Sequence, residues 1–416
     1  MPASGDGVGT IPVTFYPLAD AGSSTAAVGD ITPSGTVTAA TAYRVRVNNI
    51  DSAQFVVSIG DTVAQIVTKM TTAINANINM PVIATDATTK VTVTSKWKGI
   101  SANGLSVSVV DGSGSGITFA TVQPVGGLIN PAVDSALAQI GNVWESMIVN
   151  CLDPADTTAL TAYNTFGEGR YGALVHKPLI VFTGNTAASV ATAITVTDAR
   201  KTDRINSQLV SPGSTDLPLV VAARQVARIA SVANNNPPRD YGSQAATLLT
   251  AGPDGSQWDY PARDQAVKGG SSTVEVRDGV VNISDVVTMY HPTGDTTPAY
   301  RYVVDIVRTQ NILFNLALRF ENEEWDGAPL IPDDQATVNP SAKRPKDANA
   351  VVAALIDVLA DNAIISDPAA AKKTIQCEID GANPKRLNIA FAVQYSGNTN
   401  ITSIDYNFGF YFGGAQ

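Results

Sequence analysis

The segment from Thr402 to Phe412 constrains the fold more than any other feature of the sequence. Its residues alternate strictly between two faces, a period of two that predicts an extended β-strand with one buried face. Aromatic residues, which dominate that face, are favoured in strands. A strand this apolar has to pair with a sheet, either in its own subunit or in a neighbouring one, and the second option would build a polymer. The face comprises Thr402, Ile404, Tyr406, Phe408, Phe410 and Phe412.

The composition allows both options. A chain of 416 residues is long enough for about two to four domains. Apolar residues make up 44% and charged residues 15%, and the charged share lies well below the usual quarter of a soluble chain. A protein with few charges can cover much of its surface with copies of itself, or it can be a monomer with a large core. Composition leaves these two interpretations open.

Charge and hydropathy argue against two classes of partner. The formal net charge of −10 offers no counter-charge for phosphates, so we predict no nucleic-acid partner. No apolar run approaches the roughly 20 residues of a membrane helix, and Met1–Asp6 does not begin a signal peptide, so we predict no membrane partner. Cys151 and Cys377 lie far apart in strand-like segments, and we predict buried free thiols in a reducing compartment.

Changes in composition and in the pattern of predicted strands and helices divide the chain into four parts. Residues 1–35 form an N-terminal segment rich in Gly, Ala, Ser and Thr, with one strand-like patch at Ile11–Tyr16. Residues 36–127 predict a small, strand-rich α+β insertion domain, in which Asp61 caps a helix whose apolar face includes Ile66 and Met70. The strands expected there are Tyr43–Val47, Gln54–Ile59, Val82–Thr85, Lys90–Ser95, Leu105–Val110 and Ile117–Val122.

Residues 128–270 alternate between strand and helix patterns. This order predicts a central α/β domain with a parallel sheet and helices on both of its faces. Expected strands include Met147–Val149, Leu179–Thr183 and Ile205–Val210, and expected helices are 131–141, from Asp153-Pro154 to Phe166, and 216–233.

Residues 271–416 predict a C-terminal α+β domain that ends in the strand arm 400–412. A hairpin around Arg277-Asp278-Gly279 precedes two long helices, the first with Arg308 on its polar face and the second capped by Asp347. A second alternating segment is predicted to accept the arm through Leu387, Ile389, Phe391 and Val393. The whole chain is therefore predicted to be an α+β multidomain protein.

The residues offer little chemistry. His176 and His291 are the only histidines, and neither stands in a pattern typical of a catalytic triad; no G-x-S-x-G elbow and no metal-ligand spacing occurs. The glycines of 167–172 match G-x-G-x-x-G, but they follow a helix and lead into a strand, the reverse of a dinucleotide fold, so we interpret them as a connection. We predict no enzyme activity, no catalytic residue, no cofactor and no metal.

Two charge clusters flank the segment between the long helices. They can be solvated helix ends, or the acidic cluster of one subunit can face the basic cluster of another. The acidic cluster comprises Glu321, Glu323, Glu324 and Asp326, and the basic cluster comprises Lys343, Arg344 and Lys346.

Four stretches in a fixed order carry a family resemblance. They are Ser58–Thr62 with the helix after it, Ser95–Gly99 with Asn103-Gly104, Gly279–Ile283 running to Val287–Tyr290, and Ile404–Phe410. With the domain order, they make the chain, over residues 36–416, similar to the tail sheath proteins of contractile-tailed phages, closest to the Mu-like branch.

The resemblance implies a structural subunit that polymerises around a tail tube and contracts to drive the tube through the host envelope. It implies a subtilisin-like fold without a catalytic site for 128–270. It also implies terminal arms that add strands to a small sheet of adjacent subunits, here through Ile404, Tyr406, Phe408, Phe410 and Phe412. Expected partners are other copies of the chain, the tail tube protein, and baseplate and tail terminator proteins; the expected location is the virion tail, with host cytoplasm during assembly.

One departure and two alternatives accompany the resemblance. Family members generally carry a longer N-terminal region, so we expect the N-terminal arm of the family to be missing from 1–35. The main alternative is a surface adhesin or carbohydrate-binding protein of the virion, suggested by the strand-rich domain and by Trp97 and Trp258 as exposed aromatic residues. A hydrolase of subtilisin-like fold is the other, disfavoured by the presence of only two histidines.

Overall fold

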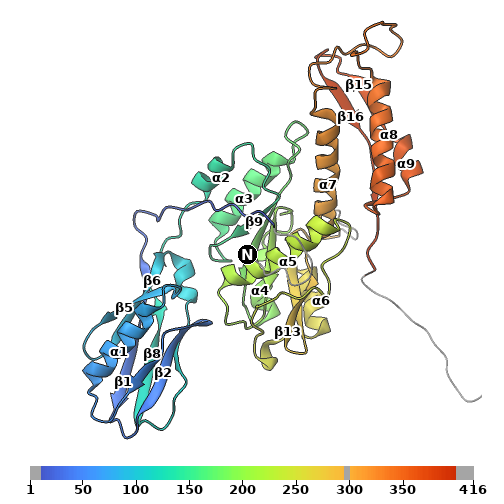
Figure 1. The fold of residues 1–416 in the computed structure, drawn as a ribbon. Coiled ribbons are helices and arrows are strands. Elements are labelled where there is room, and N and C mark those ends of the chain that lie inside the picture. The colour runs from blue at the N-terminus through green and yellow to red at the C-terminus, as the bar shows by residue number, and fades with distance from the viewer. Residues whose placement is uncertain (1–10, 295–299, 400–416) are drawn as a thin grey trace, which may run out of the picture. The chain divides into compact units, whose positions relative to one another are not determined.

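Residues 11–294 and 300–399 are described by the computed structural model (Figure 1). The architecture is mixed α+β with several domains, as predicted. The chain divides into two units: unit 1 is Met1–Pro237 with Ser243–Asn315, and unit 2 is Pro238–Gly242 with Leu316–Gln416. None of the helices in the described ranges is both long enough and apolar enough to cross a membrane.

The first part of unit 1 is rich in strands. One antiparallel sheet has the order β5-β6-β1-β8, and in a second group β2 pairs with β3, β4 and β7. The helix α1 (Val63–Ala76) contacts strands of both groups, and side chains from all of them form one core. The strands are β1 (Ala26–Gly35), β2 (Thr41–Val47), β3 (Ile50–Asp51), β4 (Phe55–Val57), β5 (Val82–Asp86), β6 (Val91–Lys98), β7 (Val107–Val110) and β8 (Ile117–Val125).

Helix α1 has the predicted buried face, including Ile66 and Met70. Its cap lies one residue later than predicted: Thr62 is the N-cap and accepts a hydrogen bond from the backbone of Gln65. The carboxylate of Asp61 instead accepts the backbone N–H of Ser58 and forms an ion pair of 2.6 Å with Lys69. The prediction of Asp61 as the cap was therefore wrong.

The central strand β1 was missed by the sequence analysis. A strand was predicted at Ile11–Tyr16, where the structure has none, while β1 pairs with both β6 and β8. Its buried positions include Ala27, Gly29 and Ile31. A Cβ at Gly29 would lie 2.5 Å from the carbonyl oxygen of Val122. Pairing with two strands, at close backbone approach beside Gly29, accompanies the burial of Ala27 and Ile31 in this segment.

The second part of unit 1 is built on a five-stranded sheet of order β13-β12-β11-β10-β9. Strands β9 to β12 are parallel, which confirms the parallel sheet, and β13 is antiparallel. The hairpin predicted at the start of the C-terminal domain supplies β12 and β13, so it extends this sheet. The strands are β9 (Met147–Asn150), β10 (Ile180–Asn185), β11 (Asn206–Val210), β12 (Ser271–Arg277) and β13 (Val280–Asp285).

The helices of this part follow the predicted alternation. They are α2 (Asp134–Ile140), α3 (Thr157–Arg170), α4 (Val190–Asp198), α5 (Pro218–Asn235) and α6 (Tyr260–Lys268), with a short 3₁₀ turn at Asp254–Ser256; the other 3₁₀ turn, Ile100–Gly104, lies in the strand-rich part. Asp156, and not Asp153, caps α3. Gly167 lies inside α3, where a Cβ would come within 2.5 Å of Ile205. The G-x-G-x-x-G match therefore begins in the helix as a packing contact, and its interpretation as a connection was wrong for this glycine.

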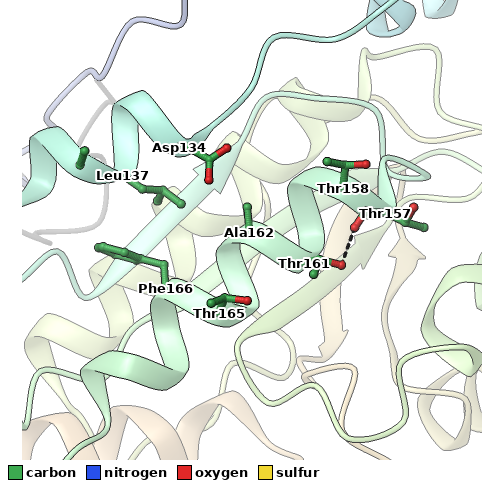
Figure 2. A pocket seen from close by; sticks show the side chains of 9 residues that line it. Asp134, Leu137, Thr157, Thr158, Thr161, Ala162, Thr165 and Phe166 are labelled. Carbon is green, nitrogen blue, oxygen red and sulfur yellow. Dashed lines mark hydrogen bonds between the residues drawn. The ribbon is translucent and has the colours of Figure 1, made fainter.

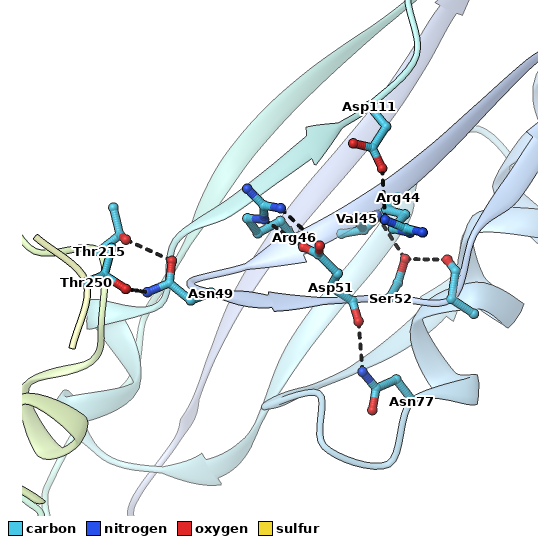
Figure 3. A network of polar contacts seen from close by, with 11 residues as sticks. Arg44, Val45, Arg46, Asn49, Asp51, Ser52, Asn77, Asp111, Thr215 and Thr250 are labelled. Atoms are coloured by element: carbon cyan, nitrogen blue, oxygen red, sulfur yellow. Dashed lines mark hydrogen bonds and ion pairs between the residues drawn. The ribbon is translucent and has the colours of Figure 1, made fainter. Parts of the chain in front are cut away.

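The tip of the β2–β3 hairpin forms polar contacts with loops beside the sheet of β9 to β13 (Figure 3). The Asn49 amide donates to Asp216 Oδ1 at 2.7 Å and to Thr250 Oγ1 at 2.8 Å, and its oxygen accepts from Thr215 at 2.9 Å. Leu217, which follows in the same loop, is buried in the core of the strand-rich part. We name this contact the Asn49 latch.

The Asn49→Ala substitution is expected to lower the free energy of unfolding of unit 1 by about 1–2 kcal/mol, because three hydrogen bonds are lost and buried Asp216 keeps fewer partners. Limited proteolysis of the loop around Thr250 should become faster. Asn79→Ala, on an exposed turn, is the matched control. Unchanged stability and cleavage in Asn49→Ala would show that the latch contributes nothing.

Unit 2 contains helices and two small ribbons of strands. Helix α7 (Val303–Phe320) begins in unit 1 and ends in unit 2. The predicted polar position Arg308 is only 2% exposed and pairs with Asp305 at 2.7 Å, so its placement on a solvated face was wrong. Other elements are α8 (Pro345–Asp361), α9 (Pro368–Lys373), β14 (Ile365–Ser366), β15 (Gln376–Ile379), β16 (Leu387–Ala390) and β17 (Gln394–Tyr395).

The start of α8 also differs in detail from the prediction. The N-cap residue is Arg344, not Asp347. Asp347 lies three positions into the helix, and its carboxylate accepts the backbone N–H of Arg344 at 2.9 Å. A carboxylate in the first turn still compensates the helix dipole, so the residue supports the helix end from a different position.

Candidate inter-subunit interface

The strands β15 and β16 form an antiparallel hairpin with the register Gln376↔Ala390 to Ile379↔Leu387. Asp380 holds its turn, because its carboxylate accepts the Asn388 amide and the backbone N–H groups of Ala382 and Asn383. These hydrogen bonds, that from Asn388 first, lower the pKa of Asp380. The carboxylate therefore keeps its charge, and its three hydrogen bonds, to a lower pH than an ordinary aspartate would.

One backbone edge of the segment 387–396 is paired along its length. The ladder begins where Asp380 N–H donates to Arg386 O, so β15 pairs with the even-numbered residues of β16. Beyond β15, the hydroxyl of Thr374 accepts the N–H of Ala392 at 2.8 Å and donates to its carbonyl at 3.2 Å. Further on, Ser396 N–H donates to Ile364 O beside the β14–β17 pair.

The opposite edge of the same segment is open. Because backbone groups alternate in an antiparallel ladder, the N–H and C=O groups of Leu387 and Ile389 point away from β15. Within the ranges that the structure describes, β16 pairs with β15 alone. We call these backbone groups the outer edge of β16.

The predicted arm-accepting residues share one face of this segment. Leu387, Ile389, Phe391 and Val393 are all half-buried; Ala390 and Ala392 between them are exposed, but Asn388 is half-buried too, so burial alternates only from Ile389 onward. This alternation agrees with the predicted period of two. Only the first two lie in β16; Phe391 and Val393 lie in the stretch between β16 and β17. The arm residues Ile404, Tyr406, Phe408, Phe410 and Phe412 lie outside the described residues.

The two charge clusters contact each other within the subunit. Lys343 forms an ion pair of 2.5 Å with Glu324 and lies 5.2 Å above the ring of Trp325. Arg344 donates to the carbonyl of Gln335. Lys346 donates to Asp333, and Glu321, Glu323 and Asp326 lie at or after the end of α7. A contact of these clusters between subunits remains a prediction, and Glu324 already has a partner of its own chain.

The cysteines and histidines have no arrangement typical of catalysis. Both cysteines are free, with Cys151 exposed and Cys377 half-buried, so the prediction of two buried thiols was wrong. Burial, with repulsion from Asp333 second, raises the pKa of Cys377 and makes it a weaker nucleophile. Both ring nitrogens of His291 are engaged, by Met289 O at 2.7 Å and Asp198 at 3.3 Å. His176 lies in a loop with φ of 38°.

The aromatic residues behind the carbohydrate-binding alternative are not exposed. Trp258 is 8% exposed, and its indole N–H donates to the carbonyl of Ala188 at 2.8 Å. Trp97 is half-buried against the core of the strand-rich part and donates to Ser101. A sugar-binding platform needs an accessible ring face, so these two residues do not favour that alternative.

A shallow hollow of about 710 Å³ lies between α2 and α3 (Figure 2). Asp134 is the charged residue of its lining, and the hydroxyl of Thr161 donates to the carbonyl of Thr157 of its own helix. The lining places no histidine, cysteine or second carboxylate beside Asp134. No group of three His, Cys, Asp or Glu side chains within residues 11–294 and 300–399 could hold a metal ion. The rest of the lining is Leu137, Ala138, Thr158, Ala162, Thr165 and Phe166.

Comparison with known proteins found a relative among the contractile tail sheath proteins. The chain is similar, over 91% of its length, to a protein of the contractile tail sheath class. That relative is the Mu-like prophage FluMu tail sheath protein of Haemophilus influenzae. The two sequences are 25% identical over 395 residues, and the match covers 78% of the relative's length. The resemblance predicted from the sequence is thereby confirmed, and it supports a structural sheath-subunit role. No family model matches the sequence.

The chain is also similar to solved structures of sheath proteins, at lower sequence identity. The sheath tail protein of Listeria innocua is 12% identical with a TM-score of 0.46, and covers 90% of this chain and 79% of that one. The sheath tail protein of Desulfitobacterium hafniense is also 12% identical, with a TM-score of 0.42 and coverages of 90% and 82%. A sheath complex of an extracellular contractile injection system in its contracted state is 10% identical, with a TM-score of 0.40 and coverages of 71% and 77%.

Proposed function

We propose that this chain is a structural subunit of a contractile phage tail sheath, which polymerises around a tail tube and contracts to drive the tube through the host envelope. The observation that carries the proposal is the similarity to a Mu-like tail sheath protein along 91% of the chain. The role is structural and not enzymatic, and the engaged ring nitrogens of His291 are consistent with it.

The contact between subunits is strand addition. The arm 400–412 of one copy pairs with the outer edge of β16 in another copy, adding main-chain hydrogen bonds and burying alternate aromatic side chains. The outer edge of β16 and the half-buried stripe of Leu387, Ile389 and Phe391 support this assignment. The connector Ser396–Asn400 lets the paired strand keep its position while subunits rotate.

Contraction follows as a movement of rigid subunits linked by these arms. The surfaces of the α/β part, proposed to have a subtilisin-like fold without its catalytic site, repack into a lattice of lower energy. No nucleotide is consumed, because the energy is stored at assembly. The partners are further copies of this chain, a tail tube protein, and baseplate and tail terminator proteins. The subunits gather in the host cytoplasm and end in the virion tail.

Deleting 400–416 is expected to abolish polymerisation, because the strand that joins subunits is removed. Negative-stain microscopy should show rods or rings for the full chain and none for the truncated chain, while circular dichroism shows the same folded α/β part. Deletion of 413–416 alone keeps the aromatic stripe and is the matched control, which should still polymerise. Rods of normal length from the longer deletion would refute the arm assignment.

A further inference from the structure

The side chain of Asn75 occupies the outer edge of the end strand β5. Its amide nitrogen donates to the carbonyl of Ala84 at 2.8 Å, and its oxygen accepts the N–H of Ala84 at 2.9 Å. Strand β6 pairs with the other edge of β5. The side-chain amide thus makes the two bonds that one residue of an added strand would make.

A second amide has the same geometry on another strand. Gln123 of β8 donates to the carbonyl of Val107 at 2.9 Å and accepts its N–H at 2.7 Å. Val107 lies in β7, whose other edge pairs with β2. The amide closes the seam between β7 and β8, two strands that do not pair with each other.

A third edge is closed by backbone. The segment 243–246 bonds to the edge strand β13, since Ser243 N–H donates to Ile283 O and Ile283 N–H donates to Gln244 O. Just after β16, by contrast, Thr374 bonds to Ala392 on the edge that β15 pairs with. The closed edges are those of β5, β7 and β13, and all three lie in unit 1. The outer edge of β16 lies in unit 2.

We propose that Asn75 and Gln123 are specificity-determining residues that exclude an incoming strand from β5 and β7 and so favour pairing of the arm with β16. The inference rests on the proposed strand addition. An incoming strand at β5 would have to break both bonds of Asn75 before forming its own, so it gains nothing at Ala84. Strands left open at a sheet edge are sites of unwanted pairing.

The test uses the full chain and a synthetic peptide of residues 400–416 carrying a photo-activated cross-linker, with cross-linked sites mapped by mass spectrometry. In the parent chain, cross-links should concentrate on 387–393. In the Asn75→Ala variant, cross-links to β5 should rise at least about tenfold, because Ala84 then presents an open N–H and C=O. Gln123→Ala gives an independent reading at β7.

Asn75→Lys is the matched control. It loses both bonds to Ala84, as Asn75→Ala does, but it places a charge at the edge, which disfavours strand pairing. Cross-links to β5 should then stay at the parent level, which separates edge opening from loss of stability. If neither alanine variant gains cross-links at β5 or β7, the inference is overturned. A different result is that the alanine variants gain cross-links at β5 or β7 while the parent chain shows none on 387–393. That result would overturn the proposed arm site and leave the blocking role of the two amides supported.

Discussion

The Ile389→Pro substitution is expected to abolish tube formation while the β15–β16 hairpin stays folded. The N–H of Ile389 belongs to the outer edge of β16, whereas the ladder to β15 uses the neighbouring even-numbered residues. Proline removes one donor to the arm, and its ring occupies space that the added strand needs. The loss is about 1–3 kcal/mol at every contact of the polymer, and each 1.4 kcal/mol is a tenfold change in affinity.

Two variants separate the donor from the side chain. Ile389→Ala shortens the half-buried side chain but keeps the N–H, so it should weaken assembly less than proline does. Ala390→Pro removes a donor of the β15 ladder itself and should unfold the hairpin, which hydrogen exchange at the backbone N–H groups of Gln376 and Glu378 would report. Negative-stain microscopy and sedimentation measure assembly. Tubes of normal length from Ile389→Pro would exclude the outer edge of β16 as the acceptor.

Gly184→Ala is expected to lower the stability of unit 1 by about 3 kcal/mol or more. A Cβ at this position in β10 would lie 1.7 Å from the carbonyl oxygen of Pro218 and 2.9 Å from the nitrogen of Ala222, both in the backbone of α5. A backbone neighbour has no rotamer with which to give way, so the helix has to move from the sheet. Thermal unfolding followed by circular dichroism measures the change.

Gly169→Ala is the matched control in the same part of the chain. Gly169 lies in α3, and a Cβ there would meet nothing within 4 Å. Alanine in a helix is favoured over glycine, so this variant should gain about 0.5–1 kcal/mol. If the melting temperature of Gly184→Ala equals that of the parent chain within error, β10 and α5 are not packed as closely as the distances state.

Local patterns predicted much of the fold. The apolar spacing of Ile66 and Met70 predicted α1 and its buried face, and the alternation of strand and helix predicted the parallel sheet of β9 to β12. The stripe of Leu387, Ile389 and Phe391 was likewise visible in the sequence, because a period of two reports which side of a strand is covered.

Features that depend on distant neighbours were missed. Strand β1 contains glycine and aspartate and has weak strand character, yet β6 and β8 pair with both of its edges. Arg308 is charged and was assigned to solvent, but its burial depends on the surroundings of α7, and Asp305 one turn earlier compensates its charge. Intrinsic preference is a weak guide wherever tertiary pairing decides the outcome.

The sequence by itself determined which faces of the elements are apolar, because this follows from residue type and spacing. Only the tertiary structure decided which backbone edges are open. The backbone N–H and C=O of Ala84 are bonded by Asn75, whereas those of Ile389 point away from β15. Both outcomes depend on the register between segments that approach each other in the folded chain. Register is a property of the pairing and cannot be read from either strand alone.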